Sequence, residues 1–152
     1  MKKLALFCLA GILLLALAGC GNSDTAIDVQ KLADDLKSGV AFKDDLAAMP
    51  DSVFETYYEV EDGDIVQKAV YAGGGGTAEE IAVFEAKDED AAARLKEAAE
   101  QRIADQKENF ENYVPGELTK LNNPVLEVKG KYVILCVCDN PEEARAIIDK
   151  AG

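Results

Sequence analysis

Hydrophobic residues recur with helical spacing in three segments of the chain. In residues 29–40 and 88–113 they fall at every third or fourth position, with charged residues at most positions between them. Pro115 lies just beyond the second segment, where a helix has already ended. A shorter apolar stripe in residues 140–148 begins with Pro141, which the first turn of a helix tolerates. These patterns predict three helices.

Runs of β-branched and aromatic residues predict four strands between these helices. They lie at residues 65–71, 81–84, 125–128 and 132–138, and glycine-containing turns join them into two hairpins. Residues 42–58 combine helical spacing with a proline, so we expect a loop with one short helix there.

The order strand, strand, helix therefore occurs twice. Placing residues 82–84 on residues 133–135 also places Asp88 on Asp139, which is consistent with two related β-β-α units. Two such units bury their apolar surfaces best as one sheet backed by helices. The sequence thus predicts an α+β fold: a two-layer sandwich with a mainly antiparallel four-stranded sheet from two β-β-α units, and an additional N-terminal helix.

The last predicted strand is apolar on both faces. Val133 and every second residue after it form one face, whereas Ile134 and Cys136 lie on the other. A strand with one solvated side alternates with polar residues, so this strand should be central and covered on both sides. We expect the first helix or residues 42–58 to cover Ile134 and Cys136. Left bare, they would form an apolar patch for a partner.

The start of the chain has the pattern of an export signal peptide. Two lysines precede an apolar run at residues 4–16. The whole uncharged stretch, residues 4–19, is shorter than the roughly 20 residues that a membrane-spanning helix needs. The next four-residue motif, Leu-Ala-Gly-Cys, ends at Cys20. It resembles the lipobox of bacterial lipoproteins, in which the cysteine accepts lipid and becomes the mature N-terminus.

This resemblance implies a division of the chain into three parts. Residues 1–19 would be a signal peptide, residues 20–26 the lipidated Cys20 with a short tether, and residues 27–152 a single α+β domain. The expected location is the extracytoplasmic face of the cell membrane, with lipid on Cys20 as the anchor.

The chain is strongly acidic, with a net charge of −13. Removing residues 1–19 takes away two lysines and no acidic residue, which leaves −15. Such a surface repels nucleic-acid phosphates and anionic lipid headgroups. We therefore expect no nucleic-acid partner, and contact with the membrane only through lipid.

Catalytic chemistry is poorly represented in the sequence. The chain contains no histidine, which removes the commonest general base and the commonest metal ligand. Neither Ser38 nor Ser52 lies in a nucleophile-elbow motif. Cys136 and Cys138 would be about 6.6 Å apart on one strand face, too far for a disulfide unless the strand bends. Buried thiols are favoured over a redox or metal pair, and no enzyme activity, metal or cofactor is expected.

Two other motifs suggest ligands less strongly. The run Gly73–Gly76 could hold a phosphate, but no lysine follows it and a strand comes next, so a flexible hairpin loop is favoured. Acidic pairs such as Glu79-Glu80 raise calcium as an alternative. The spacing around Gly63 lacks the glutamate that a calcium loop requires, so a solvated acidic surface is favoured.

Arg102 and Gln106 lie beside the apolar stripe of the longest predicted helix. They either cover core surface with their long side chains, or form a partly buried pair that organises the turn at residues 113–117. The candidate binding or structural cluster consists of Arg102, Gln106, Tyr113, Ile134 and Cys136.

A set of these positions resembles one family, the bacterial lipoproteins grouped as domain of unknown function 4358. The resemblance covers about residues 27–150 and implies a fold and a location but no catalytic residue. Gly73–Gly76 replaces a more mixed, serine-containing loop expected there. The positions that carry the resemblance are residues 70–71 and 77–84, Arg102, Gln106, Phe110, Tyr113, Pro115, Leu121 and residues 130–133.

We therefore expect a non-enzymatic, membrane-anchored lipoprotein that serves as a binding or accessory module for an envelope component or a protein partner. One alternative is an accessory or weak enzyme that uses an acid pair, which two carboxylates with opposed pKa shifts in one cleft would favour. The other is a calcium-dependent envelope module, which a calcium titration would identify.

Overall fold

The computed structural model describes residues 26–151, so the expected signal peptide and Cys20 lie outside the described residues. An antiparallel five-stranded sheet has the order β1-β2-β3-β5-β4. The strands are β1 (Ala47–Ala48), β2 (Ile65–Ala72), β3 (Glu80–Ala86), β4 (Val125–Lys129) and β5 (Tyr132–Val137). The helices are α1 (Val29–Gly39), α2 (Asp51–Tyr57), α3 (Glu89–Glu111), α4 (Leu118–Leu121) and α5 (Pro141–Ile148), with a 3₁₀ turn at Pro115–Glu117.

Side-chain caps define the starts of the two best-predicted helices. Asp28 accepts a hydrogen bond from the backbone N–H of Lys31 at 3.0 Å, and Asp88 accepts one from Ala91 at 2.7 Å. Each bond satisfies one of the N–H groups that a helix leaves unpaired at its first turn. The three predicted helices and both predicted hairpins are present, within a few residues of their expected bounds.

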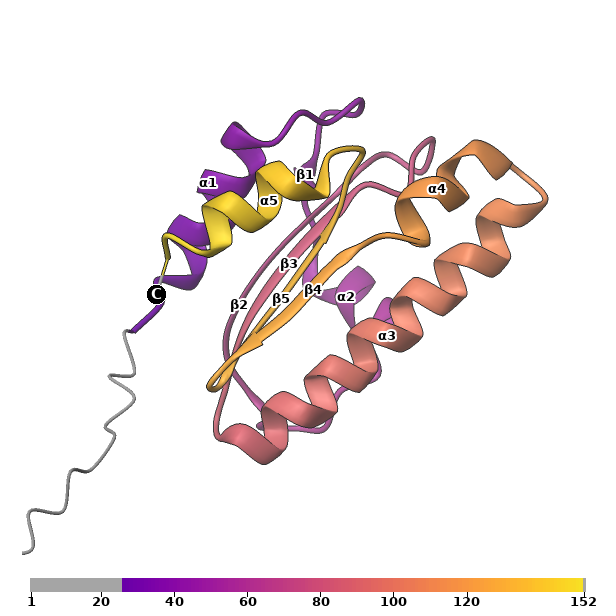
Figure 1. Ribbon diagram of the computed structural model, residues 1–152. Helices are drawn as coiled ribbons and strands as arrows, with labels where there is room; N and C mark the ends of the chain where they lie inside the picture. Colours follow the sequence, from indigo (N-terminus) through magenta and orange to yellow (C-terminus); the bar gives the residue numbers. More distant parts are fainter. Residues whose placement is uncertain (1–25, 152) are drawn as a thin grey trace, which may run out of the picture.

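Helices cover both faces of the sheet, which corrects the expected two-layer arrangement (Figure 1). α1 and α5 lie together on one face, and α3 lies on the other with α2. β5 is buried on both sides and so gives α5 no preferred face. α5 instead fills the space beside α1, where a Cβ on Gly39 would be only 2.7 Å from Ile147 Cδ1. The sheet also has a fifth strand, the short β1, in place of the expected four.

The two β-β-α segments are not related by a twofold rotation, because their helices lie on opposite faces of the sheet. Val83 of β3 pairs directly with Ile134 of β5, so a twofold axis through this pair would keep both following helices on the same face. α3 and α5 lie on opposite faces.

The predicted internal cover of β5 is confirmed. Ile134 and Cys136 are fully buried in a core that includes Leu32 and Leu36 of α1. Val133 belongs to the second core, under α3. β5 therefore lies between two helical layers and has a neighbouring strand on each side.

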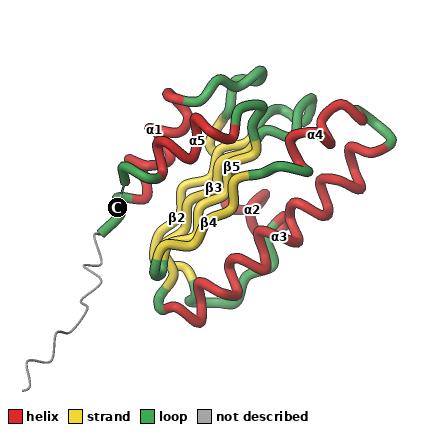
Figure 2. Tube along the Cα trace, viewed as in Figure 1, coloured by secondary structure: helices red, strands yellow, loops and turns green. Residues whose placement is uncertain are grey.

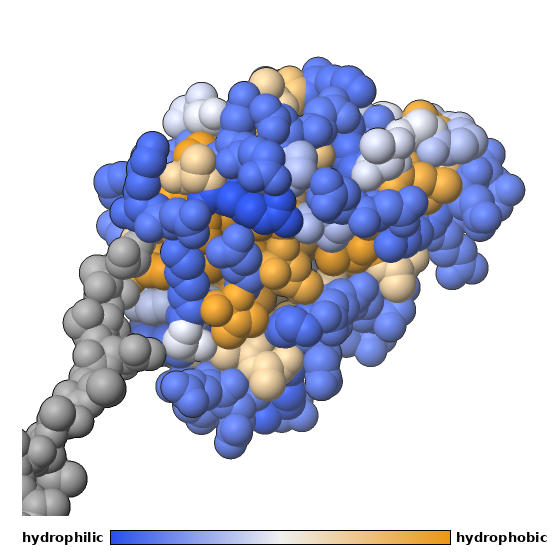
Figure 3. All heavy atoms as spheres, in the orientation of Figure 1, coloured by the Kyte–Doolittle hydropathy of each residue, from blue (hydrophilic) through white to orange (hydrophobic). Residues whose placement is uncertain are grey.

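The outer surfaces of the helices are largely hydrophilic, and hydrophobic residues gather in a band between the two helical layers (Figure 3). The strands and their connecting loops are shown in Figure 2. Within residues 26–151, no helix has both the length and the apolar character needed to cross a bilayer.

Candidate ligand-binding cleft

A row of small side chains leaves space at one end of the sheet. Ala47 of β1 pairs with Ala72 of β2, and Ala72 pairs with Glu80 of β3. Directly paired residues project from the same face of a sheet, which here is the face covered by α3. Because the two positions beside Glu80 toward the β1 edge are alanines, a cavity of about 490 Å³ remains between this end of the sheet and the helices above it.

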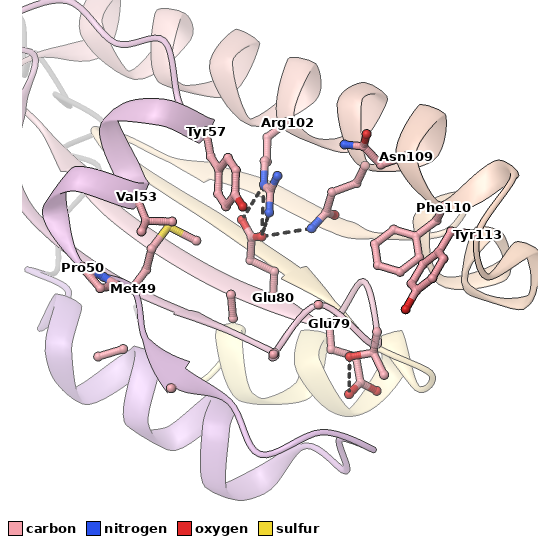
Figure 4. Close-up of a pocket in the computed structure, with 18 residues that line it drawn as sticks. Met49, Pro50, Val53, Tyr57, Glu79, Glu80, Arg102, Asn109, Phe110 and Tyr113 are labelled. Carbon is pink, nitrogen blue, oxygen red and sulfur yellow. Dashed lines mark hydrogen bonds and ion pairs between the residues drawn. The ribbon is translucent and has the colours of Figure 1, made fainter.

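The walls of this cavity come from α2 and from the C-terminal half of α3, so we call it the α2–α3 cleft (Figure 4). The α3 residues are spaced four, three and one apart, which places them on one side of the helix, and Tyr113 follows two residues beyond its end. Gly73, Gly74 and Gly75 close one end of the cleft. The facing walls are formed by Met49, Pro50, Val53 and Tyr57 on one side and by Arg102, Gln106, Asn109, Phe110 and Tyr113 on the other.

Glu80 forms the charged floor of the cleft and is completely buried. Arg102 donates to it through Nε at 3.1 Å and Nη2 at 2.6 Å, and Gln106 donates through Nε2 at 3.0 Å. The hydroxyl of Tyr58 donates to its second oxygen. Both oxygens of the carboxylate are therefore hydrogen-bonded, as a buried charge requires.

The pKa values of the neighbours agree with this arrangement. Burial alone would lower the pKa of Arg102, but its hydrogen bonds and attraction to Glu80 raise the pKa above its ordinary value. Burial, followed by the negative charge of Glu80, raises the pKa of Tyr58 well above its usual range. Near neutral pH, Arg102 is therefore charged and Tyr58 is a neutral donor.

Glu79 forms a second buried cluster, outside the floor network. Its carboxylate accepts hydrogen bonds from the backbone N–H groups of Lys43 and Asp44 at 2.9 Å. It also accepts one from Lys120 Nζ at 2.9 Å, and Lys120 contacts Glu117 at the same distance. Burial would lower the pKa of Lys120, but the hydrogen bonds to Glu117 and Glu79 raise it. This cluster ties α4 and the chain after α1 to the start of β3.

Two tyrosines are exposed at the mouth of the cleft. Tyr57 is 44% exposed and Tyr113 is 73% exposed. The guanidinium of Arg102 lies 4.2 Å from the centre of the Tyr57 ring, and the Phe110 ring centre is 6.5 Å from that of Tyr113. Each exposed ring therefore has one neighbour among the residues that line the cleft.

The structure separates the predicted cluster into two places. Arg102, Gln106 and Tyr113 line the α2–α3 cleft, whereas Ile134 and Cys136 are buried on the opposite face of the sheet, under α1 and α5. The Arg102 and Gln106 pair binds Glu80, a partner that neither of the two interpretations of the sequence included.

The acidic pair Glu79-Glu80 is not a solvated surface, which corrects a second expectation. Both side chains are buried and each contacts a cation. In the part of the chain that the structure describes, no group of His, Cys, Asp or Glu residues is arranged to hold a metal ion.

The glycine run forms the β2–β3 loop, as predicted. The loop has a specific contact as well, because the N–H of Gly74 donates to Asp44 Oδ2 at 2.8 Å. This bond connects the loop to the chain that follows α1.

Both described cysteines are free and buried. The hydrogen bond with Cys138, together with burial, raises the pKa of the Cys136 thiol far above its ordinary value. A thiol without a thiolate population is a poor nucleophile and a poor metal ligand, so Cys136 has the character of a core residue.

Inspection of the sequence did not identify Tyr57 and Asn109 in the walls of the cleft, nor Glu80 and Tyr58 in its floor network. The sequence did contain a partial indication of the floor network. An arginine and a glutamine four residues apart beside an apolar stripe need a buried acceptor. The partner carboxylate, however, lies 22 residues before Arg102, and the periodicity of a helix contains no information on contacts at that separation.

The fold and the cleft define this protein as an α+β domain with an open, aromatic-rimmed pocket above a neutralised charge network. Residues 41–138 match the model of the family described as Domain of unknown function (DUF4358), which is more than half of the chain. The chain therefore belongs to this family. The matched segment includes every wall of the cleft and excludes α1 and α5. No curated protein and no solved structure gives a match.

Proposed function

We propose that this protein is a membrane-anchored, extracytoplasmic lipoprotein whose α2–α3 cleft binds an envelope component or a partner protein without catalysing a reaction. The observation that carries the proposal is the cleft itself. Its buried charges satisfy one another, and its mouth exposes two tyrosines. A concave site with an aromatic lining and a few fixed polar groups is typical of ligand pockets.

The occupied state of the carboxylates favours binding over catalysis. A general acid or base must exchange a proton with a group in the cleft. Glu80 is buried under donors from Arg102, Gln106 and Tyr58, and Glu79 is held by Lys120 and two backbone amides. The acid-pair enzyme and the calcium module would both require these carboxylates to release their present partners.

The position of the cleft also suits an anchored binding module. α1 starts next to Ala26, where the described chain begins, and runs about 16 Å at 1.5 Å per residue. The chain after α1 then reaches the cleft end of the sheet, where Asp44 binds Gly74 and the Asp44 amide binds Glu79. A lipid anchor on Cys20 would thus be attached to the end of the domain that lies opposite the cleft. The cleft would then point away from the membrane, toward other envelope components (Figure 1).

Photo-crosslinking in the native host tests this proposal. A photoreactive amino acid replaces Tyr113 at the mouth of the cleft, and in a control it replaces Val128, which is 43% exposed on β4 and outside the cleft. We expect a specific adduct from position 113 that is absent from position 128. If both positions give the same adducts, or position 113 gives none, the cleft is not the binding site.

A further inference from the structure

We propose that the ligand of the α2–α3 cleft is an uncharged carbohydrate, a short stretch of glycan whose sugar rings pack on Tyr57 and Tyr113. This inference rests on the proposed function, because it names the ligand class of the same site. It follows from the charge, the aromatic rim and the free hydrogen-bonding groups of the cleft.

The charge balance of the cleft favours an uncharged ligand. Its one lining cation, Arg102, is paired with Glu80, and its second acid, Glu79, is paired with Lys120. A charged ligand would have to separate one of these buried pairs and leave a desolvated charge without its partner. The net charge of −13 on the whole chain further disfavours polyanions.

The exposed rings favour a ligand with flat apolar faces. One face of a sugar ring is lined by C–H groups, which pack on the electron-rich face of an aromatic ring. Tyr57 and Tyr113 lie on opposite walls of the cleft (Figure 4). The guanidinium of Arg102 packs on the Tyr57 ring, so less side-chain entropy is lost at Tyr57 when a ligand binds.

Free polar groups beside the rings favour hydroxyl-bearing ligands. The side chain of Asn109 is exposed in the cleft and makes no hydrogen bond within residues 26–151, so both its donor and its acceptor are available. Gln106 uses Nε2 to bind Glu80, which leaves its Oε1 as an acceptor of fixed orientation. Sugar hydroxyls both donate and accept, and they match such a mixed set.

An extended peptide fits the cleft less well. Peptides commonly bind by adding a strand to a sheet edge, with pockets for alternate side chains. The edge strand at this cleft is β1, which has only two residues, and both are alanines. It offers little main-chain pairing and no series of pockets for alternate side chains. A peptide would therefore depend on the same rings and amide without the contacts that normally favour it.

Isothermal titration calorimetry on the purified full chain tests the ligand class. The protein is kept in a polyoxyethylene detergent, because a sugar-headed detergent would compete for the cleft. The probes are uncharged oligosaccharides of β-1,4-linked N-acetylglucosamine and of β-1,4-linked glucose, and a set of uncharged peptides of similar length. We expect binding of at least one oligosaccharide and none of the peptides.

Three variants and one control locate the binding. Tyr113→Ala should weaken it about tenfold, the equivalent of one lost aromatic contact, while Tyr113→Phe retains the ring and most of the affinity. Asn109→Ala should also weaken binding, and Asn122→Ala, a change at an exposed asparagine outside the cleft, should not. An unchanged melting temperature is expected for all four, because the replaced side chains are exposed.

The outcomes separate the ligand class from the function of the cleft. Peptide binding that Tyr113→Ala weakens would overturn the carbohydrate proposal and leave the cleft as a binding site. Oligosaccharide binding that none of the cleft variants affects would also overturn it, because the sugar would then bind elsewhere. If no probe binds although crosslinking at position 113 gives a specific adduct, only the ligand class is wrong. If neither experiment gives a positive result, the proposed function itself fails.

Discussion

At the scale of single residues, the most informative feature is the number of fully buried charges. Glu79, Glu80 and Asp64 are each at most 1% exposed, and each contacts at least one cation. A buried pair adds little net stability compared with apolar residues of the same size, but losing one partner is costly. The pairs of Glu79 and Glu80 therefore act mainly by excluding alternative packings of the cleft end of the sheet, and the pair of Asp64 does so at the opposite end.

Replacing Arg102 with methionine tests the floor of the cleft. Arg102→Met retains the length of the side chain but leaves Glu80 buried without its cation, so the free energy of unfolding should fall by about 3–5 kcal/mol. Urea unfolding followed by circular dichroism measures the change. Lys96→Met is the control, because the pair of Lys96 with Glu100 is exposed and contributes about 0.3–0.5 kcal/mol. A loss as small as that of the control would contradict the structural role of the pair.

Asp64 makes the stability dependent on acid. Hydrogen bonds from Arg94 at 2.7 Å and from Lys87 at 2.8 Å hold the pKa of Asp64 well below its ordinary value. A carboxyl group whose pKa is lower in the folded state stabilises the fold above its unfolded pKa, about 3.9, and loses this contribution as the pH falls below that value.

The Asp64→Asn variant should therefore lose less stability on acidification than the unmodified chain. Urea unfolding at several pH values between about 3 and 7 measures the difference. Asp45→Asn is the matched control, since Asp45 is exposed and forms no ion pair within the described residues. Parallel pH profiles for the unmodified chain and Asp64→Asn would show that Asp64 is not the group responsible.

Single residues were also where the sequence was least informative. The pair Glu79-Glu80 has the composition of a solvated surface, yet neighbouring strand residues project to opposite faces, and each of these two meets a cation from a distant helix. Lys120 lies 41 residues from Glu79. A local sequence pattern gives no information on contacts between residues so far apart, so the charged floor could be identified only from the structure.

At the scale of elements, periodicity predicted most of the structure. The spacing of α1, α3 and α5 and the runs of β-formers in β2 to β5 were sufficient to locate them. The face chosen by α5 could not be predicted, because β5 is apolar on both sides and either face could receive a helix. β1 could not be predicted either, since two alanines form a strand only because β2 is beside them.

Gly75 and Gly76 are neighbours in the glycine loop that differ in how strongly their backbone conformation favours glycine. Gly75 has a φ of +93°, a conformation that L side chains rarely adopt, whereas Gly76 has no positive φ and open space around its Cα. Gly75→Ala should therefore destabilise the fold by roughly 1–2 kcal/mol. Gly76→Ala should leave stability unchanged or raise it by about 0.4–1 kcal/mol, because alanine restricts the unfolded chain. Urea unfolding distinguishes them, and equal effects would contradict the described loop conformation.

At the scale of the whole molecule, the sheet separates two regions with different tasks under the proposed function. The face under α1 and α5 adjoins the point where the described chain begins, and the face under α3 has the cleft (Figure 1). The net negative charge of the chain repels anionic headgroups, so electrostatic attraction does not favour contact of the domain with a membrane. Attachment would then depend on lipid alone.

The anchor is tested by replacing Cys20 with alanine in the native host. Cys20→Ala removes the thiol that would accept lipid, and two acyl chains on one residue are enough for stable attachment where one chain is marginal. We expect the variant to leave the membrane fraction, whereas the unmodified protein resists a high-salt wash because no ion pairs with headgroups hold it. Cys136→Ala is the matched control, since that buried thiol is unreactive and its loss should not alter fractionation. A Cys20→Ala variant held as firmly as the unmodified protein would show that something other than lipid on this cysteine attaches the domain.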